Sequence, residues 1–316
     1  MKKMMIAVLL CSIQLGALGQ LSTEQVYEHI PIFHGDSIVF PITMVNAYPF
    51  VSVEVNGIKG KLMFDNGTEA ALNLNDNLVN LKTKKKGKGN FGSGQSFDEN
   101  ISDTIAELKF TNGLTYRNLL NIKSAKLDFL QRSITPDLMG FIGYNFFKGY
   151  ILKLDYLRRK ITLYKNTEQR SSSKDFLNGE RVIAIINFEL RSRPNIPLVH
   201  VKIGDTDVLG AFDTGQFGII QFEENVEKEL KAKGLLVSGG IDGYGEELFN
   251  VNDVVIDGTF KTNVIGTPPM SRKGTDVFRK ALQVEEPSFM CFGYRFLDQY
   301  KTVWDYAEKK IYILEK

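Results

Sequence analysis

Phe64-Asp65-Asn66-Gly67 and Phe212-Asp213-Thr214-Gly215 are the two stretches of this 316-residue sequence that decide its fold. Each one ends a short apolar run typical of a β-strand, at residues 60–64 in the first case and 208–212 in the second. A single Asp-Thr-Gly is weak evidence, because its three residue types are common. Two copies in similar surroundings are much stronger evidence, and they predict that the chain consists of two related halves.

Further landmarks recur in the same order along both halves. They are the turn signals Asn56-Gly57 and Gly204-Asp205-Thr206-Asp207, the apolar motifs Phe141-Ile142-Gly143-Tyr144 and Cys291-Phe292-Gly293-Tyr294, and the motifs Leu154-Asp155-Tyr156 and Trp304-Asp305-Tyr306. A fixed order at a nearly constant offset is the signature of an internal duplication.

The pattern of short apolar runs predicts a mainly β protein. These runs are rich in Val, Ile, Phe and Tyr and are separated by Gly and Asn. Residues 166–180 are polar and lack a hydrophobic period, so we expect a linker there between an N-terminal domain over residues 39–165 and a C-terminal domain over residues 181–316. The helices expected from the sequence lie at residues 225–233, 144–147 and 294–297.

Residues 1–19 have the pattern of a cleavable secretory signal peptide. Lys2 and Lys3 precede an apolar run over residues 4–10, and Ala17-Leu18-Gly19 offers a small-residue cleavage site. The apolar run is shorter than the ~20 residues of a membrane span. We therefore expect a secreted or periplasmic bacterial protein whose mature chain has no membrane-inserted segment.

Charge and cysteine content exclude several classes of function. The chain has 39 basic and 37 acidic residues, so loss of Lys2 and Lys3 leaves the two balanced, which argues against nucleic acid as a partner. Cys291 is then the only cysteine, and we expect a small buried residue without a disulfide. The three histidines lack metal-site spacing, and we expect neither a metal nor a cofactor.

The doubled acidic turn permits a specific chemistry. A glycine after each aspartate lets backbone amides approach the carboxylate closely. If the two turns face each other, the neighbouring carboxylates share one proton, because like charges ~3 Å apart do not both ionise readily. One carboxyl group can then activate a water while the other protonates a substrate carbonyl. Peptide hydrolysis without a metal becomes feasible.

Each half resembles a retropepsin-type aspartic protease unit, in the Phe-Asp-Thr/Asn-Gly turn and in the later apolar-apolar-Gly motif. The resemblance implies an all-β fold of two tandem, closed retropepsin-like β-barrels that form a pseudo-dimer around an inter-domain cleft. It implies that Asp65 and Asp213 are the catalytic carboxylates. It also implies active-site turns at Asn66, Gly67, Thr214 and Gly215, and a glycine-rich flap for which the candidates are Gly92, Gly94, Gly243 and Tyr244.

The sequence departs from this family at Asn66, where the family has Thr or Ser, and at Gln216, where a small residue is usual. An Asn amide offers a donor and an acceptor, but on a longer arm. The expected function is an aspartic endopeptidase acting as a monomer on extended peptides or unfolded protein. Two alternatives stay open: a catalytically degenerate protein that binds peptides without cleavage, and a homodimer in which two Asp213 turns meet and Asp65 is structural.

Overall fold

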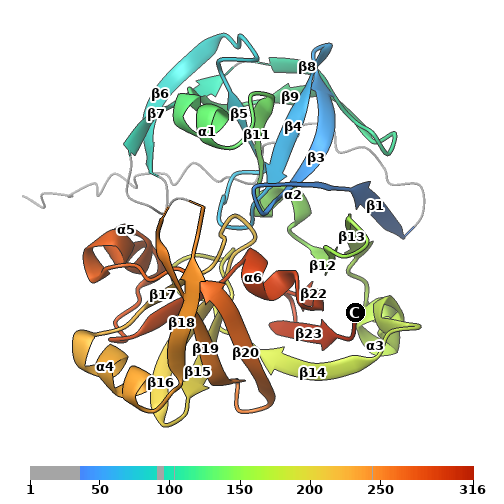
Figure 1. Cartoon of the computed structure of the whole chain (residues 1–316). Helices are drawn as coiled ribbons and strands as arrows, with labels where there is room; N and C mark the ends of the chain where they lie inside the picture. The colour runs from blue at the N-terminus through green and yellow to red at the C-terminus, as the bar shows by residue number, and fades with distance from the viewer. Residues whose placement is uncertain (1–35, 91–95, 103, 244) are drawn as a thin grey trace, which may run out of the picture.

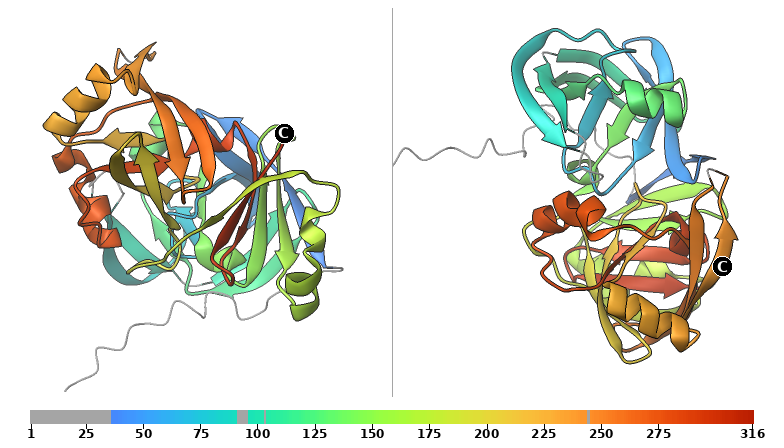
Figure 2. Two further views of the ribbon diagram at one scale, coloured as in Figure 1. Left: turned by 90° about the horizontal axis from the view of Figure 1, so that it is seen from below. Right: turned by 60° about the vertical axis from the view of Figure 1, so that its left-hand side comes forward.

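The computed structural model describes residues 36–90, 96–102, 104–243 and 245–316. The mainly β prediction is confirmed, because three sheets build two lobes and a bridge between them (Figures 1 and 2). The expected signal peptide at residues 1–19 lies outside the described residues, as do Gly92, Gly94 and Tyr244. Within the described ranges, no helix is long and apolar enough to cross a membrane.

The first lobe contains a ten-stranded sheet with the order β6-β7-β10-β5-β11-β4-β3-β8-β9, and β2 pairs with β3. Its β3–β4 hairpin turns at Asn56 and Gly57, whose φ angles of 48° and 83° match a two-residue type I′ turn, as the sequence predicted. The strands are β2 (Thr43–Val45), β3 (Tyr48–Val55), β4 (Ile58–Phe64), β5 (Leu72–Asn75), β6 (Thr83–Asn90), β7 (Ser96–Ser102), β8 (Thr104–Phe110), β9 (Thr115–Leu120), β10 (Lys123–Ala125) and β11 (Leu138–Ile142).

The second lobe contains a seven-stranded sheet with the order β17-β21-β16-β15-β19-β18, and β20 pairs with β19. In the part of the chain that the structure describes, the strand order of each lobe's sheet stays open, so closed barrels are not shown. The strands are β15 (Leu198–Ile203), β16 (Thr206–Phe212), β17 (Ile219–Gln221), β18 (Leu236–Ile241), β19 (Glu247–Ile256), β20 (Phe260–Thr267) and β21 (Phe289–Phe292).

The third sheet joins the two halves of the chain. It is a six-stranded antiparallel sheet with the order β1-β13-β12-β22-β23-β14. At its centre Leu152 of the first half pairs with Trp304 of the second. This bridging sheet lies beside both lobes in Figure 1. Its strands are β1 (Ser37–Pro41), β12 (Tyr150–Asp155), β13 (Lys160–Lys165), β14 (Val182–Asn187), β22 (Lys301–Asp305) and β23 (Lys310–Leu314).

The three helices expected from the sequence are present as α2 (Tyr144–Phe147), α4 (Glu224–Ala232) and α6 (Tyr294–Leu297). Three others were not predicted: α1 (Asp128–Ser133), α3 (Glu168–Ser173) and α5 (Arg272–Leu282). The helix α3 and a 3₁₀ turn, η2 (Asp175–Leu177), occupy the polar segment 166–180 that connects the two halves. The helix α5 is capped by Ser271, the residue before its first turn, whose hydroxyl accepts a hydrogen bond from Gly274 N at 3.1 Å.

Each acidic turn is held by a strand pair of the same kind. The strand before the turn lies parallel to the strand of the later apolar motif, β4 beside β11 and β16 beside β21. Asp65 N donates to Ile142 O at 2.9 Å, and Asp213 N donates to Phe292 O at 3.1 Å. The repeated apolar motifs therefore fix where the two aspartates leave their sheets.

The glycine of each apolar motif is required by a close approach of two chain segments. A Cβ at Gly143 would lie 2.2 Å from Thr68 O, and one at Gly293 would lie 2.1 Å from Gln216 O. Both distances are far below a normal van der Waals contact, so only glycine fits at either position. These glycines let the loop after each aspartate pack directly against its own lobe.

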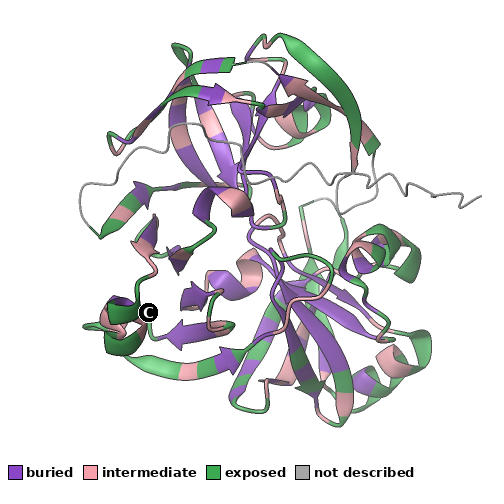
Figure 3. Cartoon of the chain, turned by 180° about the vertical axis from the view of Figure 1, so that it is seen from behind, coloured by how far each residue is buried: buried purple, intermediate pink, exposed green. Residues whose placement is uncertain are grey.

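The phenylalanine before each aspartate stacks on a second phenylalanine in the core of its lobe. Phe64 stacks on Phe147 at 5.1 Å between ring centroids, and Phe212 stacks on Phe292 at 4.8 Å. All four rings are buried. Buried residues line the inner faces of both lobes and converge where the lobes meet (Figure 3). The turns thus rest on close-packed cores, which leave little room for the aspartates to shift.

Candidate active site

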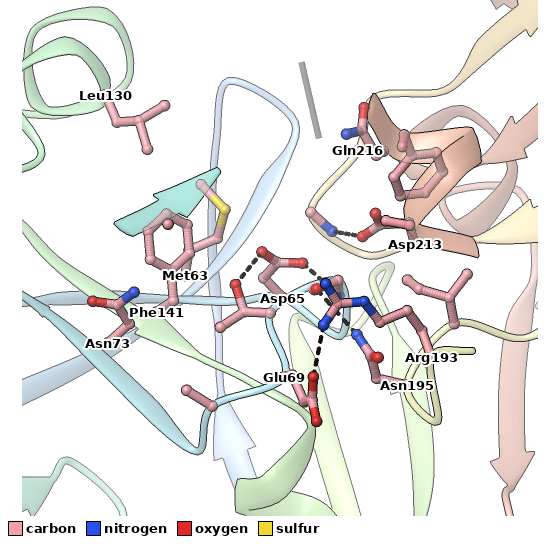
Figure 4. A pocket seen from close by; sticks show the side chains of 18 of the residues that line it. Met63, Asp65, Glu69, Asn73, Leu130, Phe141, Arg193, Asn195, Asp213 and Gln216 are labelled. Carbon is pink, nitrogen blue, oxygen red and sulfur yellow. Dashed lines mark hydrogen bonds and ion pairs between the residues drawn. The ribbon is translucent and has the colours of Figure 1, made fainter. Parts of the chain in front are cut away.

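The structure brings Asp65 and Asp213 together within one chain, so no second copy is needed to pair them. A Cβ at Gly67 would lie 2.8 Å from Asp213 Oδ2 and 2.9 Å from Asp65 Oδ1, so both carboxylates face the same point. A Cβ at Gly215 would lie 2.3 Å from Asp65 Oδ1. Each glycine therefore leaves room for the carboxylate of the opposite turn. Figure 4 shows the two aspartates on neighbouring loops.

The hydrogen bonds to the two carboxylates are unequal. Gly67 N donates to Asp65 Oδ1 at 2.7 Å, and Gly215 N donates to Asp213 Oδ1 at 2.8 Å. Asp65 Oδ2 also accepts a hydrogen bond from Thr68 Oγ1 at 2.8 Å. The corresponding position after the second turn is Gln216, which lines the same cavity. Asp65 is therefore the better stabilised as an anion.

The residues after the aspartates lock the two turns to each other. Thr214 Oγ1 accepts a hydrogen bond from Asn66 N and donates one to Phe64 O, both at 3.0 Å. In return, Asn66 Oδ1 accepts one from Thr214 N at 2.7 Å, and Asn66 Nδ2 donates one to Phe212 O at 3.1 Å. The lock is reciprocal. The longer Asn66 side chain reaches the same kinds of backbone groups in the opposite turn as the Thr214 hydroxyl does.

Two further residues hold this region: Asn195, which the sequence did not point to, and Tyr306, which belongs to the repeated motif Trp304-Asp305-Tyr306. Asn195, in the loop before β15, donates through Nδ2 to Asn66 O at 2.7 Å and to Gly67 O at 3.0 Å. The hydroxyl of Tyr306 donates to Asn195 O at 2.9 Å. For the Asn195 loop, the available sequence signal is that Pro49 and Pro197 stand 148 residues apart, the same offset as the two aspartates.

The two aspartates lie at a cavity of ≈ 490 Å³ between the lobes. Its charged rim includes an ion pair that joins the two halves, with Arg193 Nη1 2.8 Å from Glu69 Oε2 (Figure 4). Apolar residues of the first lobe line one side, and they include Met63, Phe97, Leu130, Ile134 and Phe141. Apolar residues of the second lobe line the other, and they include Ile196, Val277, Phe278, Ala281 and Leu282.

The two expected flap regions differ in their relation to this cavity. The hairpin of β6 and β7 borders it through Gly89 and Phe97, on either side of the segment that contains Gly92 and Gly94. Gly243 follows β18 in the second lobe, and it is exposed and does not line the cavity. The first-lobe hairpin is thus the one positioned next to the aspartates.

Burial and mutual repulsion control the protonation of the dyad. Burial raises the pKa of Asp65, while the hydrogen bonds from Thr68 and Gly67 act in the opposite direction. Burial, followed by the charge of Asp65, raises the pKa of Asp213 well above its usual range. We therefore assign the shared proton to Asp213 and the negative charge to Asp65.

This assignment predicts how stability depends on pH. A carboxyl group whose pKa is raised in the folded state contributes stability below its unfolded pKa of ~3.9, and that contribution is lost as the pH rises through the folded pKa. Asp213→Asn removes this penalty. We expect its melting temperature at pH 7 to exceed that of the unmodified protein, by roughly 2–4 °C for each kcal/mol gained. The difference should shrink toward pH 4.

Calorimetry at pH 4 and pH 7 measures this effect. Asp205→Asn is the matched control, because the Asp205 side chain is 98% exposed and its removal should leave the pH dependence unchanged. A melting temperature of Asp213→Asn at pH 7 equal to or below that of the unmodified protein would contradict the assignment.

Comparison with known proteins supports the fold. No protein-family model matches the sequence, and no curated protein sequence matches it. Among solved structures, an aspartic proteinase from Irpex lacteus is similar over 89% of this chain and 97% of its own, with a TM-score of 0.53 and 13% identity. The chain has a pepsin-like fold. Likeness at this identity concerns the fold and leaves the activity open.

Two similar structures carry other names. Basic 7S globulin from soybean matches 88% of this chain and 95% of its own, with a TM-score of 0.54 and 10% identity. Conglutin gamma, a basic 7S globulin from lupine seeds, matches 89% and 95%, with a TM-score of 0.56 and 8% identity. The pepsin-like fold is thus found in a chain named as a proteinase and in chains named as globulins. Its activity has to be argued from the site.

Proposed function

We propose that this protein is an aspartic endopeptidase that hydrolyses extended peptides with a water activated by Asp65 and Asp213. The observation that carries the proposal is the pair of carboxyl groups that approach the same point at Gly67, with the Asp65 carboxylate also packed against Gly215. Asp65, as the anion, takes a proton from the attacking water. Asp213, as the acid, donates its proton to the carbonyl oxygen of the substrate.

The walls of the cavity support a peptide as the substrate. Apolar residues of both lobes line the cavity at which the aspartates lie, beside the charged residues Glu69, Glu99, Lys123 and Arg193. A chain laid across the dyad would place side chains against both walls, where burial of a large apolar side chain contributes ~1.5–3 kcal/mol. We therefore propose that the preferred substrates carry large apolar residues on both sides of the cleaved bond.

The remaining expectations belong to the same proposal. Each half derives from a duplicated retropepsin-like unit, and the protein acts as a monomer, without metal or cofactor, on peptides or unfolded protein. It is secreted or periplasmic after removal of residues 1–19. Support for duplication comes from the parallel arrangement of β4 with β11 and of β16 with β21, since each pair presents one aspartate in the same way.

A cleavage assay on the mature protein tests the proposal. We expect a library of unfolded peptides to be cut between about pH 3 and 6, the range in which a carboxyl dyad holds one proton. A peptide mimic of the transition state should block cleavage, while a metal chelator should have no effect. Mass spectrometry of the products gives the residues beside the cleaved bond. Binding of peptides with no cleavage at any pH would overturn the proposal in favour of a binding protein.

A further inference from the structure

Asn195 connects the loop before β15 to the first acidic turn through its side chain and its backbone. It is 1% exposed. Its Nδ2 donates to Asn66 O and to Gly67 O, at 2.7 and 3.0 Å. Its backbone oxygen accepts from Asn66 Nδ2 and from the Tyr306 hydroxyl, both at 2.9 Å. Two asparagines from different halves of the chain therefore bond to each other in both directions.

The number of donors explains why an asparagine is useful at position 66. A threonine hydroxyl has one hydrogen to donate, whereas an asparagine amide has two. Thr214 uses its single hydrogen on Phe64 O. Asn66 donates one hydrogen to Phe212 O, as the lock requires, and the other to Asn195 O. A threonine in place of Asn66 could make the first of these bonds and would leave the second unmade.

We propose that Asn195 is a positioning residue for the dyad, and that Asn66 is an adaptation to Asn195 and not a defect of the active-site turn. This inference rests on the proposed function. Asn195 holds the backbone oxygens of Asn66 and Gly67, so it fixes the turn that aims the Asp65 carboxylate. The loop is tied down a second time, because Arg193 pairs with Glu69 just beyond the same turn.

The Asn195 side chain is oriented by its donors. Its Oδ1 is buried without a hydrogen-bond partner among the described residues. A buried unpaired acceptor is costly, so its orientation needs an explanation. Here both Nδ2 bonds go to the acidic turn. Among the described residues, the Asn195 side chain therefore makes hydrogen bonds to the acidic turn alone.

The first experiment replaces Asn66 by the residue of the second turn. Asn66→Thr is expected to lower kcat about 5- to 10-fold, the effect of losing one buried hydrogen bond of ~1 kcal/mol, while KM changes less than about 2-fold. Higher activity in Asn66→Thr than in the unmodified protein would overturn the proposal, because Asn66 would then be a defect that threonine repairs.

The second experiment removes the Asn195 side chain. We expect Asn195→Ala to lower kcat about 10- to 100-fold, because a displaced catalytic group loses rate even when binding persists. The pH profile of kcat should also shift, since the relation of the two carboxyl groups changes. A lower melting temperature with an unchanged pH profile and kcat per folded molecule would overturn the proposal and leave Asn195 a structural residue.

A matched control and a readout without catalysis complete the test. Asn112 also donates to a backbone oxygen, Val39 O at 2.9 Å, but it lies on an exposed turn, so Asn112→Ala should leave kcat and its pH profile unchanged. The titratable groups that influence the dyad or line its cavity from other elements are Tyr156, Tyr306, Cys291, Tyr48, Glu69, Glu99, Lys123 and Arg193. None of these groups is itself replaced in the variants, and the pKa of Tyr306, the one that contacts Asn195, is raised far above the range of the assay, so a changed profile reports on the dyad.

The titration of Asp65 and Asp213 can be followed by NMR of their carboxyl carbons, whether or not peptides are cleaved. Asn195→Ala should shift both titrations, and Asn112→Ala should shift neither. If the unmodified protein cleaves no peptide but these shifts appear, the proposed function fails and the positioning role stands. If it cleaves peptides and Asn195→Ala leaves the titrations and kcat unchanged, the function stands and the positioning role fails.

Discussion

Replacing either Asp65 or Asp213 by asparagine is expected to reduce kcat/KM for peptide cleavage by about 10²- to 10⁴-fold, the contribution of a general acid or base. Asn keeps the shape of Asp but cannot take a proton from water or donate an acidic one. Because the two carboxyl groups share one proton, the loss of either one disables both steps. The effects should therefore be far from additive, with the double variant little worse than each single one.

Kinetics on purified variants measure this loss. Asp205→Asn serves as the control, because it removes a fully exposed carboxylate without touching the cavity. Folding of the two dyad variants is checked by their melting temperatures, which should not fall at pH 7. Activity that survives in Asp65→Asn but not in Asp213→Asn would point to the cross-chain arrangement, in which two Asp213 turns meet and Asp65 is structural.

Gly215→Ala is expected to reduce kcat about 10²-fold, the usual result of a displacement of ~1 Å at a reacting group. The added Cβ would lie 2.3 Å from Asp65 Oδ1 and 2.5 Å from Asp65 Cγ, so the carboxylate or the turn has to move. Gly67→Ala should act in the same direction, because its Cβ would lie 2.8 Å from Asp213 Oδ2. The chemistry of both carboxyl groups is untouched, so only their positions are tested.

Gly243→Ala is the matched control for these two substitutions. A Cβ at Gly243 would meet nothing within 4 Å, and the residue does not line the cavity. Its activity should equal that of the unmodified protein in the same steady-state assay. Full activity in Gly215→Ala would mean that the position of Asp65 is not important, which would contradict the proposed dyad.

Much of the fold follows from local sequence patterns. Asn56-Gly57 specifies its hairpin because few residues other than Asn and Gly adopt the positive φ angles of a type I′ turn. The helix α4 follows from a run of Glu and Lys at helical spacing. The recurrence of the acidic turn and of the apolar motifs points to two matching halves. In each lobe the strand of the apolar motif lies parallel to the strand that precedes the aspartate.

The bridging sheet could not be predicted in this way. The motifs around Asp155 and Asp305 were recognised as repeats, but a strand pattern does not state which strand is its partner. Strand β12 of the first half pairs with β22 of the second half, although most of the second half separates them in the sequence. Each strand also pairs with a neighbour in its own half. The number and closure of the sheets depend on such long-range pairings, which a local pattern does not contain.

The sequence predicted the two carboxylates of the candidate site, but not the residues that hold the acidic turns in place. Asp65 and Asp213 lie in a repeated motif, which makes them visible. Asn195 has no counterpart at the same offset, where the first half has Ala47. Its importance arises only after folding, when the loop before β15 meets a turn from the other half. Compared with Thr214 alone, Asn66 looks like the loss of a residue that aligns the turns. Its second hydrogen bond, to Asn195 O, gives a reason for an asparagine at this position.

The bridging sheet also determines when the two lobes can be joined. Its two central strands, β12 and β22, belong to opposite halves, and β22 comes after both aspartates in the sequence. A chain emerging from the ribosome therefore presents Asp65 and Asp213 before the strand that pairs with β12 across the two halves. The pairing that joins the lobes is thus formed only after both acidic turns have been synthesised.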